Sequence, residues 1–317
     1  MGTRVRVAFL YPGQGAQRPG MLHDLPRHPA VAGTLAEAER VLPGSSRRDG
    51  AEELASTVGA QVALCVAGVA ATRALAAEGA TPDVVAGHSA GGFPAAVAAG
   101  VLTFPEALRA VHHRATLMRD AHPTGYGMTA VLGPTVPQVR RLIAAVSTAA
   151  DPLYLAVVDS GHQTVVTGTL GALARLTRAA PGYGAHRVQR LPIPVPSHCP
   201  LLTPVATAMA THLASVPHRP LTTPFIANST ARVLTTPGAV LHDLAWGVAT
   251  TLRWHDATAL LGELGITLFL QSPPGHVLTH LLPSSRTVAL ADTPLRDAAL
   301  AVRRARDANP WHGRGHP

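Results

Sequence analysis

The pentapeptide Gly87-His88-Ser89-Ala90-Gly91 has the spacing G-x-S-x-G. A short apolar run at 84–86 precedes it and an Ala-rich stretch follows, so the sequence predicts a strand, a sharp turn and a helix. A serine on such a turn lies at the helix N-terminus, where the next backbone N–H can stabilise an oxyanion. In a chain with 29 glycines the pentapeptide is also compatible with a plain turn, but its context favours a nucleophile at Ser89.

A serine hydroxyl is a weak nucleophile at neutral pH and needs a base within hydrogen-bond reach. Seventeen histidines leave the choice of base open. His198 is favoured because it follows the proline-rich segment 192–197, where a predicted subdomain ends, and clefts between domains commonly hold active sites. His88 is the alternative, although neighbouring residues on a turn point in different directions. With an unperturbed histidine as base, we expect activity to fall as the pH drops through about 6.5.

The segments that must position these residues alternate between strand-like and Ala/Leu-rich helical runs, which predicts an α/β fold. Outside the middle of the chain, we expect strands at 5–11, 84–86, 225–227 and 267–270, and helices at 52–77 and 105–121.

The middle of the chain has a different pattern, with the order β-α-β-β-α-β of a ferredoxin-like unit. The expected strands are 126–132, 153–158, 164–167 and 186–193, with helices at 136–146 and 170–179. We therefore predict a ferredoxin-like subdomain at 125–195, inserted into a larger domain made of 1–124 and 196–303. The Gly-, Pro- and His-rich residues 304–317 are expected to form a flexible tail.

Composition excludes several classes of function. With 317 residues, of which 47% are hydrophobic and 14% charged, the chain can bury a large core. Every one of its 26 basic residues is arginine, which excludes mechanisms that need a lysine amine, such as a Schiff base. The net charge of +8 is spread along the chain without interleaved aromatics, so we expect no nucleic-acid partner. The same charge would attract phosphate-bearing small molecules or an acidic protein.

The remaining composition signals concern metals, redox state and membranes. Cys65 and Cys199 lack the C-x-x-C spacing of a zinc or disulfide framework, and no H-E-x-x-H occurs. We therefore expect no metal. Neither uncharged stretch, 54–72 or 84–105, is convincing as a membrane span, and residues 1–11 predict a strand and turn, not a signal peptide. A cytoplasmic protein without a membrane partner is the expectation.

Four features, taken in order, resemble the malonyl-CoA:acyl carrier protein transacylase family. They are the segment Phe-Leu-Tyr-Pro-Gly-Gln-Gly-Ala-Gln at 9–17, Gly-His-Ser-Ala-Gly-Gly at 87–92, Arg114 on a predicted helix, and Val-Pro-Ser-His-Cys at 195–199. The resemblance covers residues 5–282, and the motifs are specific as a set. It implies an α/β-hydrolase-like large domain with a ferredoxin-like small subdomain, which agrees with the insertion predicted above.

The resemblance also implies roles for individual residues. Ser89 is the position that is acylated, and His198 is its base. The backbone N–H groups of Gln14 and Ala90 match the oxyanion hole. The substrate would be a CoA thioester, malonyl-CoA, with an acyl carrier protein as partner and no cofactor.

Arg114 matches the family's arginine that binds the free carboxylate of malonate. Arginine suits this role because its planar, permanently charged fork can donate two parallel hydrogen bonds to a carboxylate. Without the resemblance, Arg114 would be interpreted as a surface residue in a row with Arg109 and Arg119.

Within the family, several stretches look most similar to the epsilon subunit of malonate decarboxylase: 126–133, 197–202, 229–234, 243–246 and 253–257. That resemblance implies an acceptor thiol on a phosphoribosyl-dephospho-CoA group, with other malonate decarboxylase subunits as partners. Two departures stand out. Gly247 lies where relatives carry an amide side chain near the catalytic histidine, and Pro273-Pro274-Gly275-His276 replaces the usual Gly-Pro-Gly.

The sequence therefore predicts a ping-pong S-malonyltransferase with a serine nucleophile. Three alternatives stay open: a transacylase of fatty-acid or polyketide synthesis with a phosphopantetheine carrier, a serine thioester hydrolase on the same fold, and a non-catalytic carrier-binding protein.

Overall fold

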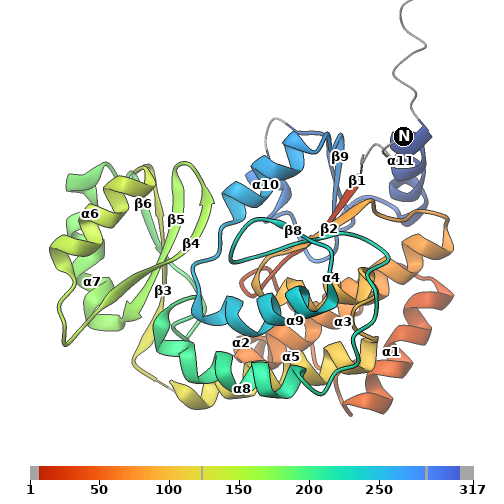
Figure 1. Cartoon of the computed structure of the whole chain (residues 1–317), viewed down its shortest axis with the longest axis horizontal. Helices are drawn as coiled ribbons and strands as arrows, with labels where there is room; N and C mark the ends of the chain where they lie inside the picture. The colour runs from red at the N-terminus through yellow and green to blue at the C-terminus, as the bar shows by residue number, and fades with distance from the viewer. Residues whose placement is uncertain (1–6, 123, 283–284, 308–317) are drawn as a thin grey trace, which may run out of the picture.

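The computed structural model describes residues 7–122, 124–282 and 285–307. They form a mixed α/β structure with one six-stranded and one four-stranded sheet, which lie side by side in Figure 1. The larger sheet has the order β10-β9-β1-β2-β7-β8. Its bounds are β1 Val7–Tyr11, β2 Val84–Gly87, β7 Phe225–Ile226, β8 Val233–Leu234, β9 Leu268–Gln271 and β10 Thr287–Ala289.

All strand pairs of the larger sheet are parallel except β7 with β8. Every residue of β1, β2 and β9 is buried, as expected for parallel strands whose two faces are both covered by helices. The accompanying helices are α1 Pro29–Val41, α2 Ala51–Ala55, α3 Thr57–Ala77, α4 Gly92–Ala98, α5 Phe104–Ala121, α8 Thr203–Leu213, α9 Pro237–Trp246, α10 Trp254–Glu263 and α11 Leu295–Asp307.

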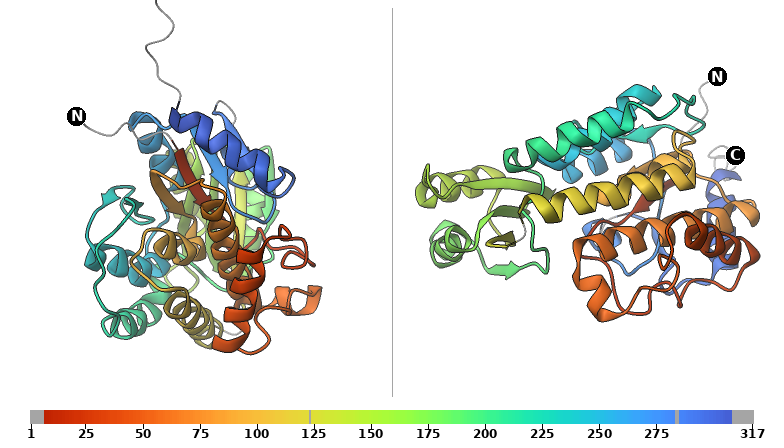
Figure 2. Two further views of the ribbon diagram at one scale, coloured as in Figure 1. Left: turned by 90° about the vertical axis from the view of Figure 1, so that its right-hand side faces the viewer. Right: turned by 90° about the horizontal axis from the view of Figure 1, so that it is seen from below.

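Helix α3 occupies most of the predicted helix 52–77, but the helix is interrupted at Ser56, which separates α2 from α3. The Ser56 hydroxyl accepts a hydrogen bond from the backbone N–H of Gly59 at 2.9 Å, which caps α3. Among the described residues α3 is the one helix long and apolar enough to cross a membrane, and 78% of its most apolar window is buried inside the protein. Figure 2 shows it packed among the other helices of the larger sheet.

The smaller sheet has the order β4-β5-β3-β6, and all its pairs are antiparallel. Its chain order is β3 Tyr126–Leu132, α6 Val136–Val146, β4 Leu153–Ser160, β5 Gln163–Thr169, α7 Leu170–Ala179 and β6 Arg187–Arg190. Side chains alternate between its faces. Val131 and Val166 join a separate core with α6 and α7, whereas Ala130 and Val165 belong to the main core.

Two sequence predictions are corrected by the structure. The strand expected at 186–193 ends at Arg190, because prolines at 192, 194 and 196 have no N–H to donate to a ladder. Of the tail expected at 304–317, residues 304–307 are helical and end α11, where Ala305 is 5% exposed and packs in the main core. The rest of that tail lies outside the described residues.

Candidate active site

The serine of the G-x-S-x-G motif lies directly after β2, on a turn that both flanking glycines make possible. Ser89 has a φ of 54°, in the left-handed region. A Cβ atom on Gly87 would lie 2.2 Å from the carbonyl carbon of Gly91, and one on Gly91 would lie 2.1 Å from the carbonyl oxygen of Tyr11. Any side chain at either glycine would therefore force the turn open and displace Ser89.

A second contact fixes the turn from a distant part of the chain. The backbone N–H of Ser89 donates to Oδ1 of Asn228 at 2.9 Å. The loop carrying Asn228 is held in turn by the buried carboxylate of Asp243, which accepts from the N–H of Asn228 at 2.8 Å and from the hydroxyl of Ser229 at 2.6 Å. Ser89 thus depends on a buried polar network that begins on α9.

His198 is the histidine that meets the serine. Its Nε2 lies 2.8 Å from Oγ of Ser89, and its Nδ1 lies 2.7 Å from the backbone carbonyl oxygen of Gly247. A carbonyl oxygen can only accept, so Nδ1 carries the ring proton and Nε2 is left to accept the serine proton. A main-chain carbonyl here orients the imidazole, and the departure at Gly247 leaves that contact intact.

The environment of His198 holds the imidazole neutral. The side chain is buried, with 3% of the residue exposed. Burial, and next the positive charge of Arg114, lower the pKa of His198 to about 3, against a smaller opposing effect of the Gly247 carbonyl. The expectation of a base titrating near pH 6.5 is therefore wrong for this site, because the residue lies in an interior next to a cation.

Arg114 is buried as well, and it is not the surface residue that its helix position alone would indicate. It is 2% exposed, whereas Arg109 and Arg119 on the same helix are exposed. One guanidinium nitrogen donates to Oε1 of Gln61 at 2.6 Å, and the other lies 3.3 Å from Oγ of Ser89. Burial lowers the pKa of Arg114 to about 10, so the group stays cationic at neutral pH.

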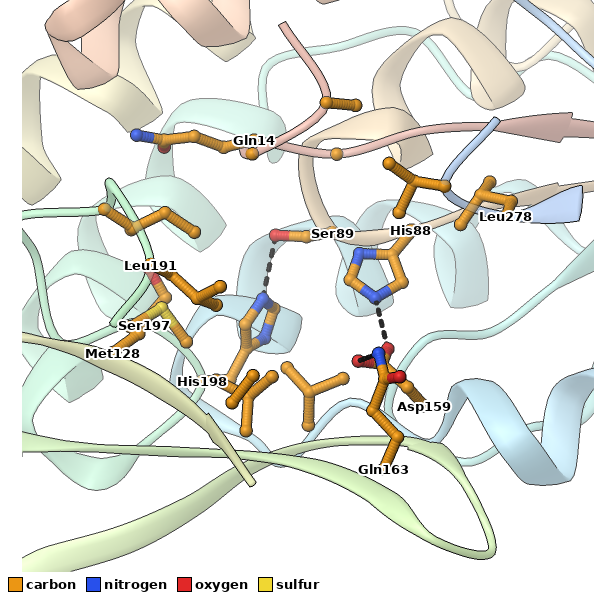
Figure 3. Close-up of a pocket in the computed structure, with 18 of the residues that line it drawn as sticks. Gln14, His88, Ser89, Met128, Asp159, Gln163, Leu191, Ser197, His198 and Leu278 are labelled. Atoms are coloured by element: carbon orange, nitrogen blue, oxygen red, sulfur yellow. Dashed lines mark hydrogen bonds and ion pairs between the residues drawn. The ribbon is translucent and has the colours of Figure 1, made fainter. Parts of the chain in front are cut away.

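Ser89, His198, Gln14 and Gln61 line a cavity of about 230 Å³ between the two sheets. Arg114 lies just beyond this lining, where it contacts Gln61 and Ser89. Figure 3 shows Ser89 facing His198 within it, with Gln14 beside them. Among the described residues, neither the backbone N–H of Gln14 nor that of Ala90 donates to an acceptor. Both are thus available for an oxygen that develops negative charge.

His88, the alternative base, turns away from Ser89. Its Nε2 lies 3.1 Å from Oδ1 of Asp159 at the end of β4, and its ring meets the edge of Trp254. Figure 3 shows this pair on the side of the cavity away from Gln14. His88 therefore links the turn to the smaller sheet, and it forms no hydrogen bond with the serine hydroxyl.

A family model described as acyl transferase domain matches residues 8–240. The malonyl CoA-acyl carrier protein transacylase of Escherichia coli (strain K12) is 34% identical over 285 residues, which cover 87% of this chain and 91% of that protein. The chain belongs to the acyl transferase domain family.

Solved structures agree with this acyl transferase assignment. The malonyl CoA-acyl carrier protein transacylase of Coxiella burnetii superimposes with a TM-score of 0.89 at 30% identity, covering 96% of this chain and 99% of that one. A type II polyketide synthase acyl carrier protein in complex with its malonyl-transacylase gives a TM-score of 0.88 at 32% identity, covering 93% and 99%.

The structure of this acyl transferase brings together Ser89, His198, Arg114 and the Gln14 loop, as the sequence analysis expected of neighbours in one site. Sequence reasoning missed Gln61, Asn228 and Asp243, which hold them in place. No spacing rule connects residues that lie so far apart along the chain. Within the described ranges, no group of three or more His, Cys, Asp or Glu side chains is placed to hold a metal ion.

Proposed function

We propose that this protein transfers malonyl from malonyl-CoA to the thiol of an acyl carrier protein through an acyl-Ser89 intermediate. The observation that carries the proposal is the position of Arg114. A buried cation lies 3.3 Å from the serine Oγ, and no carboxylate of the described chain forms an ion pair with it. An acyl group with its own carboxylate would supply the missing anion beside the reacting atom.

The first half-reaction begins as Nε2 of His198 takes the Oγ proton and Oγ attacks the thioester carbonyl carbon. The backbone N–H groups of Gln14 and Ala90 stabilise the oxyanion. The C–S bond then breaks, and the proton on His198 leaves with CoA as its thiol. In the second half-reaction the carrier thiol gives its proton to His198, its sulfur attacks the acyl-serine, and Ser89 recovers its proton.

The neutral imidazole supports the base role. Since burial and Arg114 disfavour the imidazolium, His198 is neutral and its Nε2 is unprotonated over a wide pH range, as the base role requires. The proton it takes up is stored only briefly, because the same environment favours its return to the departing or attacking sulfur.

For the acceptor, the names of the relatives support an acyl carrier protein of fatty-acid or polyketide synthesis. The resemblance of five segments to the malonate decarboxylase epsilon subunit supports a finer proposal, in which the acceptor is a carrier subunit with a phosphoribosyl-dephospho-CoA thiol. Either reaction would take place in the cytoplasm. Both acceptors present a thiol to the acyl-serine, so the two proposals are distinguished by which purified carrier receives the malonyl group.

We also propose a division of the chain that follows the two sheets. The described residues within 7–124 and 196–307 form an α/β-hydrolase-like domain, supported by the largely parallel sheet and the serine turn after β2. Residues 125–195 form a ferredoxin-like subdomain, supported by the strand order β4-β5-β3-β6 and the two helices on one face.

The test uses malonyl-CoA labelled in the malonyl group. We expect label on the intact protein, lost in Ser89→Ala, and transfer of that label to one of the two purified carriers when each is offered. Label released as free malonate without transfer would identify a thioester hydrolase. Absence of any labelled protein or carrier would overturn the proposal.

A further inference from the structure

A buried glutamine connects the cation of the site to the loop that carries the oxyanion donor. Gln61 lies on α3 and is 1% exposed. Its Oε1 accepts from Arg114 at 2.6 Å, and its Nε2 donates to Oε1 of Gln14 at 3.1 Å. Nε2 of Gln14 reaches Thr57 in the first turn of the same helix at 3.3 Å. Thr57, Gln14, Gln61 and Arg114 thus form one chain of side-chain hydrogen bonds.

The Arg114 end fixes the direction of every hydrogen bond in this chain. A guanidinium has only donors, so the atom of Gln61 that faces Arg114 must be the carbonyl oxygen. The amide nitrogen then necessarily faces Gln14, where it needs an acceptor. One amide therefore orients both the Arg114 guanidinium and the Gln14 side chain.

That Gln61 is uncharged matters as much as where it places the Arg114 guanidinium. An amide oxygen orients the guanidinium without neutralising it, and the two observed hydrogen bonds use two of its five N–H donors. A carboxylate at the same place would form a buried ion pair with Arg114. The cation would then be satisfied before any acyl group arrived.

We propose that Gln61 is the positioning residue that sets acyl selectivity, by aiming Arg114 at the acyl carboxylate while leaving its charge uncompensated. This inference rests on the proposed function, since it requires Arg114 to bind the malonyl carboxylate. The second hydrogen bond, to Gln14, ties the same side chain to the oxyanion loop. An effect through Arg114 should depend on the acyl carboxylate, whereas an effect through Gln14 should be shared by every acyl group.

The experiment compares kcat/KM for malonyl-CoA and acetyl-CoA in the full-length protein. In Gln61→Glu the shape is kept and a carboxylate replaces the amide, so we expect the malonyl-to-acetyl ratio to fall about 100-fold or more. Gln61→Met removes both hydrogen bonds without adding charge, and we expect a smaller fall in the ratio, about 10-fold, with a moderate loss for both substrates. Gln138→Glu makes the same chemical change at the first turn of α6 and should alter neither value.

A double variant separates positioning from a general disturbance. If Gln61→Glu acts through Arg114, it should cause no further loss of the ratio in an Arg114→Ala background. Thermal unfolding of each variant identifies a folding defect, in which case Gln61→Met carries the test. An unchanged ratio in folded Gln61→Glu, or additive losses in the double variant, would overturn the role of Gln61.

The outcome for the wild-type protein keeps this inference distinct from the proposed function. If the wild type transfers malonyl and Gln61→Glu keeps its ratio, only the role of Gln61 fails. If the wild type transfers no malonyl to Ser89 or to any carrier, the proposed function itself fails and Gln61 loses its premise.

Discussion

The two sheets make opposite contributions to one cavity. The wall formed by the larger sheet and its helices, here called the polar wall, carries polar side chains that hydrogen-bond to one another, including Ser89, Gln14 and Gln61. The wall formed by the smaller sheet is mainly apolar, and its polar side chains lie at the turn between β4 and β5. It contributes Met128, Ala130, Val157 and Val165, with Asp159 and Gln163 at that turn. The larger sheet supplies the reactive groups, and the smaller sheet supplies the shape of the space beside them.

The difference follows from how each sheet is built. In a parallel sheet the carboxyl ends of all strands meet at one edge, and the loops that leave them converge there. The loops after β1, β2 and β7 bring Gln14, Ser89 and Asn228 to that edge, although their strands are far apart in the chain. An antiparallel sheet has no such edge. It offers a face instead, on which alternate side chains are apolar.

Removing the Ser89 hydroxyl should have the largest effect of any change in the polar wall. Ser89→Ala should abolish the malonyl adduct, because burial raises the pKa of Cys199 to about 11 and also raises the pKa of Cys65, so neither thiol is ready to take the acyl group. Mass spectrometry of peptides after incubation with malonyl-CoA measures the adduct. An adduct on Cys199 or Cys65 would mean that the serine mechanism is wrong.

Loss of the base should be the next largest effect. His198→Ala should lower the acylation rate by at least about 100-fold, the lower end of what general base catalysis contributes. Pre-steady-state release of CoA measures that rate. His88→Ala is the matched comparison, since His88 binds Asp159 and not Ser89. A greater loss in His88→Ala than in His198→Ala would contradict the assignment of the base.

Arg114 tests selectivity within the polar wall. Arg114→Ala leaves the malonyl carboxylate buried without a partner, which weakens malonyl binding by on the order of several kcal/mol. Acetyl has no carboxylate and avoids this loss. The ratio of kcat/KM for malonyl-CoA to acetyl-CoA should fall about 100-fold. Arg114→Lys should restore little of it, because an ammonium cannot form the bidentate pair. Equal losses for both substrates would show that Arg114 acts on structure or on CoA.

The apolar wall should respond differently. Ala130→Leu on β3 narrows the cavity without changing its charge, so we expect KM for both CoA esters to rise a few-fold and the malonyl-to-acetyl ratio to stay the same. Ala144→Leu on the exposed face of α6 is the control for the same enlargement. A changed ratio in Ala130→Leu would mean that the smaller sheet also selects the acyl group.

The pH profile gives the smallest effect in the wild type. With the pKa of His198 at about 3, kcat/KM for acetyl-CoA should change less than about twofold between pH 5 and 8. Removing the cation in Arg114→Ala favours the imidazolium, so the pKa of His198 should rise and the acid limb should move to higher pH. A wild-type acid limb centred near pH 6.5 would contradict the electrostatics of the site.

Sequence patterns predicted the local parts of this structure well. The turn at Ser89, helix α6 and strand β3 follow from short-range hydrophobic periodicity and from glycine and proline positions. Helices such as α1, α8, α9 and α10 were not predicted. The first three begin at or next to a proline, which is also typical of turns. The helical structure of all four depends on tertiary packing: α1 packs on α3 and α5, α8 on α5 and α9, and α10 on β4.

The sequence by itself determined a serine on a strand-to-helix turn, an α/β chain with an inserted β-α-β-β-α-β segment, and chemistry without a lysine. Among seventeen histidines it favoured His198 by its place after the proline-rich segment, but left His88 open as the alternative base. Only the tertiary structure placed Nε2 of His198 2.8 Å from Oγ of Ser89, buried Arg114, and connected it through Gln61 to Gln14. These contacts join residues tens of positions or more apart, and burial, which sets the charge state of His198, exists only once the chain is folded.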